Sequence, residues 1–66
     1  MNNQQFERFT GIEKRLGIYI EDPSNALGSL IQDLMSEGDD DQHIVELLMD
    51  SRDHYIDNGM AVVAPV

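Results

Sequence analysis

The chain has no cysteine and no tryptophan among its 66 residues, and only four of its side chains are basic. Without cysteine, no disulfide reinforces the fold and no thiolate can bind a metal. No apolar run approaches the ~18 residues that a membrane span requires. The first residues, MNNQQFERF, lack the basic-then-apolar layout of a signal peptide. We therefore expect a single small, soluble, cytoplasmic domain with no membrane partner.

Three of the four basic side chains lie in the first 20 residues. Thirteen acidic residues against four basic ones give a formal net charge of -9. Residues 1–20 carry a net charge of +1, whereas residues 21–57 carry -10 because eleven acids there face Arg52 alone. Such a distribution repels nucleic acid and anionic membranes and attracts basic protein surfaces. A basic protein is therefore the expected partner, although solubility alone is the simpler interpretation.

The spacing of apolar residues predicts three helices, over residues 3–17, 23–37 and 41–57. Asn2 or Asn3 can cap the first helix, while Gly11 leaves open whether residues 3–17 form one helix or two. Asp22-Pro23 is a typical start for the second helix. An aspartate triplet begins the third, and Asn58-Gly59 ends it.

These elements predict an all-α, three-helix domain over residues 1–59, followed by an apolar tail over residues 60–66. The apolar arc of the third helix is wider than one neighbouring helix needs, so we expect a homodimeric bundle. Alternatively, the tail folds back over the surplus, and it is the only evident partner for a strand at residues 18–20. The expected core or dimer residues are Leu27, Leu30, Ile31, Leu34, Ile44, Leu48 and Tyr55.

The polar face of the third helix is almost purely acidic. Glu46, Asp50, Asp53 and Asp57 fall within roughly 60° of the helix circumference, and Arg52 flanks them on the apolar side. Ordinary surface helices mix both signs of charge. Carboxylates that recur at each turn can imitate a row of phosphates. The residues predicted to bind a partner are Glu46, Asp50, Asp53 and Asp57, together with Asp39, Asp40 and Asp41 at the N-terminal end of the helix.

We therefore expect a non-enzymatic regulator or inhibitor that mimics nucleic acid and occludes a basic, nucleic-acid-binding surface of its partner. In size and charge the chain resembles short acidic accessory or inhibitor proteins of phages and mobile elements. The alternative is a dimeric assembly or adaptor protein that binds through apolar helix faces and uses its acids for solubility. Direct nucleic-acid binding would need Arg8, Lys14 and Arg15 gathered on one face of a dimer, and the overall charge disfavours it.

No cofactor, metal or catalytic residue is expected. The serines lie in no nucleophile motif, and no glycine-rich phosphate loop follows a strand. His43 with Glu46, and His54 with Asp50, have the spacing of metal ligands, but the inward-facing carboxylate set of a helical metal centre is missing. The segment DDDQHIVELLMD fails as a calcium loop because Ile44 stands where glycine is required.

Overall fold

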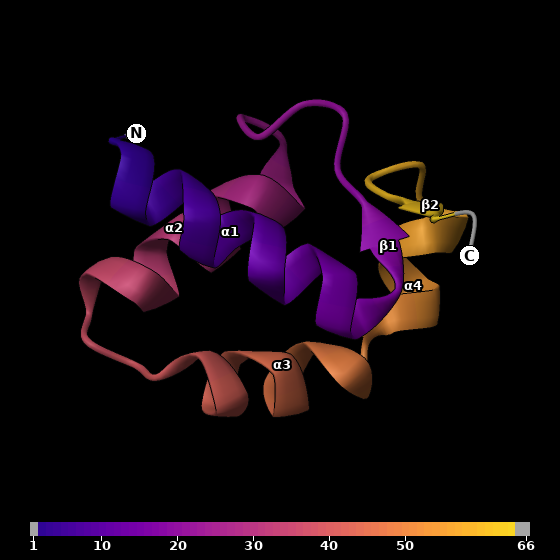
Figure 1. Ribbon diagram of the computed structural model, residues 1–66. Coiled ribbons are helices and arrows are strands. Elements are labelled where there is room, and N and C mark those ends of the chain that lie inside the picture. Colours follow the sequence, from indigo (N-terminus) through magenta and orange to yellow (C-terminus); the bar gives the residue numbers. More distant parts are fainter. Residues whose placement is uncertain (1, 65–66) are drawn as a thin grey trace.

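The computed structural model describes residues 2–64, in which four helices surround a core and a two-stranded antiparallel sheet lies at one end (Figure 1). In chain order the elements are α1 (Asn3–Leu16), β1 (Ile18–Tyr19), α2 (Ala26–Ser36), α3 (Asp41–Met49), α4 (Arg52–Asp57) and β2 (Val62–Val63). Helix α1 packs against both α2 and α3. The fold is thus a small, mostly helical domain, as expected, but it is not purely α. None of the helices within residues 2–64 has the length and apolar character that crossing a bilayer requires.

Helix α1 is continuous through Gly11, which settles the choice between one helix and two. At its start, Asn2 and Gln5 form a reciprocal capping box: the Gln5 N–H donates to Asn2 Oδ1 at 2.9 Å and the Asn2 N–H donates to Gln5 Oε1 at 3.2 Å. At its end, Gly17 adopts a left-handed conformation with φ of 68°. Packing of the apolar face outweighs the ~1 kcal/mol that an internal glycine costs relative to alanine.

Helix α2 begins at Ala26, three residues later than the Asp22-Pro23 signal predicted. The Asp22 carboxylate instead accepts hydrogen bonds from the backbone N–H and the hydroxyl of Ser24, at 2.9 and 2.6 Å. Asn25 then caps the helix by accepting the Gly28 N–H at 2.8 Å, and its amide donates to the Met60 carbonyl at 2.9 Å. Aspartate often makes such local turns in place of a cap, and here Asn25 provides both the cap and a tertiary contact.

Gly28 allows the turn before α2 to fold back over the first turn of that helix. A Cβ atom at this position would lie 2.2 Å from the Pro23 carbonyl oxygen. Small residues near the start of a helix allow another part of the chain to approach it closely. At Gly28 that part is the backbone of Pro23 in the preceding turn. No larger side chain fits here without displacing the Pro23 turn.

The predicted helix over residues 41–57 is wrong as a single rod. Helix α3 stops at Met49, Asp50 and Ser51 form a turn, and α4 departs in another direction (Figure 1). The turn lets Arg52 reach the C-terminal end of α1, where its Nε donates to the Leu16 carbonyl at 2.7 Å and its Nη2 donates to the Gly17 carbonyl at 3.4 Å. These carbonyls have no partner inside their own helix, so the break is compensated by a tertiary cap.

The C-terminal segment folds back onto the domain and pairs with β1, the strand for which the tail was the expected partner. Strand β2 pairs with β1 in the register Ile18 with Val63 and Tyr19 with Val62. Ala61 is buried, and the Ala64 N–H donates to the Gly17 carbonyl at 3.1 Å. The last two residues of the tail lie outside the described residues. The buried apolar core comprises Phe9, Ile12, Leu16, Ile18, Ile20, Leu27, Ile31, Met35, Ile44, Val45, Leu48 and Ala61.

Candidate functional sites: an acidic surface and an apolar pocket

The aspartate triplet at the start of α3 contacts the rest of the structure in three different ways. Asp40 caps α3, because its carboxylate accepts the His43 N–H at 2.8 Å. The Asp41 carboxylate accepts from Arg8 Nε and Nη2 at 3.0 and 2.7 Å, and the Asp39 carbonyl accepts from Arg8 Nη2 at 3.2 Å. Arg8 therefore joins α1 to the start of α3 and pairs with one of the three charges.

The four predicted carboxylates farther along the chain are all exposed, but they do not share one helix. Glu46 lies on α3, Asp50 is the residue that ends α3, and Asp53 and Asp57 lie on α4. The regular spacing expected of a row of phosphates is therefore absent. Arg52 Nη1 is 3.5 Å from the Asp53 carboxylate, which remains 91% exposed, so this pair is weak.

The apolar residues predicted to form the core or a dimer contact divide into two groups. Four of them, Leu27, Ile31, Ile44 and Leu48, lie inside the chain's own core. Leu30, Leu34 and Tyr55 are partly buried against that core. Among the described residues, the large apolar side chains that face solvent are Phe6, Tyr19, Leu47, Met49, Val62 and Val63.

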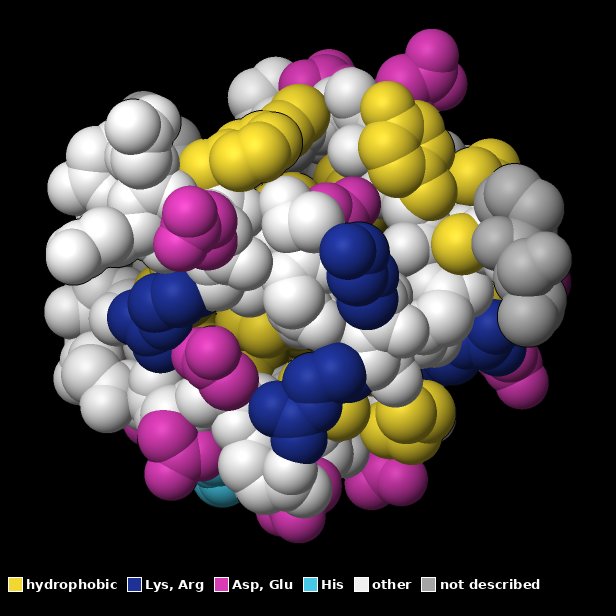
Figure 2. Space-filling model, in the orientation of Figure 1, with side chains coloured by type: hydrophobic (Ala, Val, Ile, Leu, Met, Phe, Trp, Pro, Cys, Tyr) yellow, Lys and Arg dark blue, Asp and Glu magenta, His cyan; other side chains and the backbone are white. Residues whose placement is uncertain are grey.

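The basic side chains of α1 do not form a continuous basic strip. Figure 2 shows Lys and Arg side chains interleaved with carboxylates on the face that α1 presents. Arg8 is paired with Asp41, and Arg15 donates a hydrogen bond to Gln42 on α3. These cations therefore help to fasten α1 to α3.

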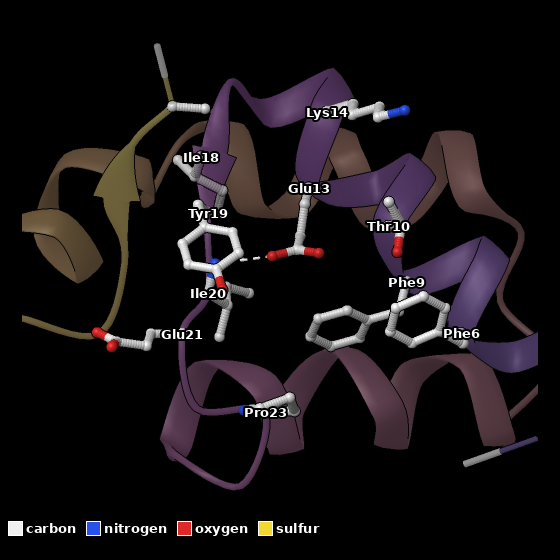
Figure 3. A pocket seen from close by; sticks show the side chains of 11 residues that line it. Phe6, Phe9, Thr10, Glu13, Lys14, Ile18, Tyr19, Ile20, Glu21 and Pro23 are labelled. Carbon is white, nitrogen blue, oxygen red and sulfur yellow. Dashed lines mark hydrogen bonds between the residues drawn. The ribbon is translucent and has the colours of Figure 1, made fainter.

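A cavity of about 430 Å³ opens between α1, β1 and the turn that precedes α2 (Figure 3). Its walls are mostly apolar. The lining residues are Phe6, Phe9, Thr10, Glu13, Lys14, Ile18, Tyr19, Ile20, Glu21, Pro23 and Ala64. A volume of this size lies within the range of roughly 300–1,000 Å³ that is typical of small-molecule sites.

Glu13 places a carboxylate within these apolar walls. The residue is only 9% exposed, and its Oε2 accepts the Ile20 N–H at 2.7 Å. Burial raises the pKa of Glu13 above its ordinary value, and the hydrogen bond from Ile20 opposes that shift. In Figure 3 the second carboxylate oxygen points into the pocket, and the hydrogen bonds within residues 2–64 include none to it. The arrangement can accept a hydrogen bond from a ligand or pair with a cation.

Glu13 and the pocket are not among the residues and sites predicted from the sequence, although the sequence carries a signal for Glu13. Glu13 lies four residues after Phe9 and seven after Phe6, so it belongs to the apolar stripe of α1. A charge on an apolar stripe indicates a buried ionisable group. The pocket wall contributed by the Pro23 turn has no comparable signal, since it depends on the late start of α2.

His43 and His54 are both exposed, and the His54 ring packs against Tyr55 with the ring centroids 5.5 Å apart. Over the part of the chain that the structure describes, no three His, Asp or Glu side chains gather in a way that could hold a metal ion. Comparison of the chain with protein families, with curated proteins and with solved structures found no match.

Proposed function

We propose that this chain is a non-enzymatic regulator that occludes a basic, nucleic-acid-binding surface of a partner protein. The binding region is the acidic surface, defined as Asp39, Asp40, Asp41, Glu46, Asp50, Asp53 and Asp57. The observation that carries the proposal is that Glu46, Asp50, Asp53 and Asp57 face solvent, while Arg8 binds at the start of α3 and Arg52 binds the carbonyls at the end of α1.

Those two arginines neutralise only part of the acidic surface, because Arg8 pairs with Asp41 and Arg52 is weakly paired with Asp53. Arg8 is bound to the start of α3 through Asp41 and the Asp39 carbonyl, and Arg52 is bound to the carbonyls that end α1. Five more carboxylates than arginines remain in this part of the molecule. An excess of one sign attracts an oppositely charged surface over several ångströms and raises its rate of association.

The break between α3 and α4 limits the kind of recognition that we propose. Evenly spaced phosphates are matched best by carboxylates on one straight helix, whereas those of the acidic surface are divided between α3 and α4. The proposed complementarity is therefore one of charge over two helices and the turn between them. A partner with a broad basic surface suits this arrangement better than a narrow groove shaped for a single rod.

The proposal is tested by asking whether the protein releases DNA from a basic peptide. A decalysine peptide is bound to a fluorescently labelled DNA duplex, the protein is added, and release of the duplex is followed by fluorescence anisotropy. We expect release at low salt and progressively less release as salt rises, because exposed charges are screened.

A matched pair of triple variants locates the effect, since each raises the net charge from -9 by three. The surface variant carries Glu46→Gln, Asp53→Asn and Asp57→Asn. The control variant carries Glu7→Gln, Asp33→Asn and Glu37→Gln. We expect the surface variant to lose more activity than the control. Equal losses, or release that ignores salt, would overturn the proposal.

A second proposal, self-assembly or an adaptor role through apolar contacts, is favoured by a specific observation. Tyr19 and Val62 are directly opposite each other in the sheet and are 54% and 55% exposed. A substitution such as Leu48→Asp cannot test self-association, because Leu48 belongs to the core and the variant would lose its fold. Val62→Asp changes an exposed position, so sedimentation should show a smaller species for this variant if the sheet forms a homodimer contact. An identical sedimentation coefficient would contradict that role for the sheet.

A further inference from the structure

We propose that the pocket beside Glu13 binds a small organic cation with an apolar body, of the arylalkyl-ammonium class. This function is separate from the acidic surface, because none of the residues that define that surface lines the pocket. Three observations support it: the size of the cavity, the single buried carboxylate inside it, and the aromatic rings that line the same cavity.

The dimensions of the pocket favour a free small molecule over a lysine side chain of a partner. A cavity of about 430 Å³ has room for an aromatic ring with a short chain, whereas an aliphatic lysine stem would leave much of it unfilled. The walls from Ile18, Ile20 and Pro23 offer apolar contact along the body of such a ligand. Burial of the ligand's apolar surface against these walls provides the non-specific part of the affinity.

Glu13 provides the selectivity for positive charge. Oε2 is occupied by the Ile20 N–H, whereas the other oxygen faces the cavity (Figure 3). A buried carboxylate is unfavourable unless it is paired or fully hydrogen-bonded. An ammonium group that enters the pocket would donate to the second oxygen and would lower that cost, which a neutral ligand of the same shape cannot do.

Aromatic side chains reinforce the same preference. The rings of Phe6, Phe9 and Tyr19 line the pocket, and Figure 3 shows the Glu13 carboxylate between the Tyr19 ring and the two phenylalanine rings. The faces of such rings attract cations. Lys14 and Glu21 also line the pocket with opposite charges, and the Lys14 side chain points away from Glu13 in Figure 3. The local balance therefore remains negative.

The test is a titration of the isotope-labelled protein with phenethylammonium, followed by amide chemical shifts. The neutral comparison ligand is 2-phenylethanol, which has the same size and shape. We expect saturable shifts at residues 18–21 with phenethylammonium and binding about tenfold weaker with the alcohol, since a charged partner strengthens a hydrogen bond. Equal affinities for the two ligands, or no saturable shifts, would overturn the proposal.

Variants separate the charge of Glu13 from a general effect on the fold. Glu13→Gln can still accept the Ile20 N–H, so it should abolish the preference for the cation while keeping the fold. Glu7→Gln removes the same charge from an exposed position of α1 outside the pocket and should leave that preference unchanged. Tyr19→Leu keeps apolar volume at a half-exposed position and should weaken phenethylammonium more than the alcohol.

A lysine derivative tests whether the pocket prefers a free small molecule to a protein side chain. N-acetyl-lysine methylamide should bind more weakly than phenethylammonium, because its stem fills less of the cavity. Tighter binding of the lysine derivative would contradict our assignment and would identify the pocket as a receptor for a protein side chain. A Glu13→Gln variant that retains the full cation preference would contradict it as well.

Discussion

The acidic surface and the pocket contain the same chemical group in opposite surroundings. On α3 and α4, the carboxylates of Glu46, Asp50, Asp53 and Asp57 lie in water. In the pocket, one carboxylate lies among apolar side chains, with its residue 9% exposed. Exposed charges act together over a distance and are weakened by salt. A buried charge acts on a single neighbour at short range and is screened far less.

This difference assigns a different kind of partner to each region. A set of exposed carboxylates can attract a broad basic surface, but it recognises little about the shape of that surface. A single carboxylate inside shaped walls can distinguish ligands that differ by one charge. Substitutions around the pocket should therefore change the free energy of unfolding more than substitutions on the acidic surface.

Gly28→Ala should cause the largest loss of stability, because the added Cβ would lie 2.2 Å from the Pro23 carbonyl oxygen. Overpacking against backbone typically costs about 1–3 kcal/mol, which is a large share of the stability of so short a chain. Pro23 also lines the pocket, so phenethylammonium binding should weaken. Urea unfolding measures the first effect and the ligand titration measures the second.

Gly11→Ala is the matched control for Gly28→Ala. Gly11 is also helical, but nothing lies within 4 Å of the Cβ that alanine would add. This variant should stabilise the protein by up to ~1 kcal/mol. A Gly28→Ala variant that unfolds at the same urea concentration as Gly11→Ala would contradict the close contact at Pro23.

Arg52→Gln should be the next most destabilising change, because it removes the donors to the Leu16 and Gly17 carbonyls. Loss of hydrogen bonds from a charged group costs about 1–3 kcal/mol. Lys14→Gln makes the same change of charge at an exposed residue and should cost less than about 0.5 kcal/mol. Thermal unfolding at low and high salt checks the cause: a loss that disappears at high salt would show that Arg52 acts by neutralising nearby acids.

Glu13→Gln should raise the melting temperature at neutral pH. The folded-state pKa of Glu13 is above its ordinary value of 4.5, so the folded protein binds more protons than the unfolded chain between these two values. The stability contributed by protonation is complete below the ordinary value and is lost as pH rises through the folded pKa. Glutamine cannot ionise and should avoid this loss.

The advantage of Glu13→Gln should therefore grow as pH rises from below 4.5 toward neutrality. Lys14 and Glu21, which line the same pocket, are present in both proteins. Asp22 is also common to both, and hydrogen bonds from the Ser24 hydroxyl and N–H lower its pKa, which gives a pH dependence of opposite sign. Calorimetry over a pH series measures the difference in melting temperature between the two proteins. A difference that is constant with pH would contradict the burial of the Glu13 carboxylate.

The smallest effects are expected on the acidic surface. Asp53 lies in the first turn of α4 and Asp57 is its last residue. A carboxylate favours the start of a helix and disfavours its end. Asp53→Asn should thus destabilise, and Asp57→Asn should stabilise, each by a few tenths of a kcal/mol. Chemical unfolding of the two variants shows whether each is more or less stable than the unsubstituted protein. A loss of stability above about 1 kcal/mol for either would show that its carboxylate is structural.

Local signals in the sequence predicted the parts of the fold that depend on neighbouring residues. The apolar spacing and an asparagine cap at Asn2 or Asn3 predict α1 without any knowledge of the rest of the chain, and the structure assigns the cap to Asn2. Ile44 and Leu48 were recognised as apolar-face residues and are buried in the core. Such features rest on helix periodicity and on capping chemistry, both of which act within a few residues.

The features that the sequence did not predict depend on contacts between distant residues. The turn at Asp50 and Ser51 is compensated by Arg52 at the end of α1, about 35 positions earlier in the chain. The late start of α2 is linked to the contact between Asn25 and Met60. Periodicity carries no information about such partners, so the helix over residues 41–57 was predicted as one piece and the pocket was not predicted at all.

The most direct test of the account is to map decalysine binding on the isotope-labelled protein by amide chemical shifts. We predict that the perturbations concentrate in residues 39–57, weaken with salt, and leave the amides of pocket residues 18–21 unchanged. Perturbations that centre on the pocket, or that spread evenly over α1 and α2, would contradict the claim that the carboxylates of α3 and α4 form the surface for a basic partner.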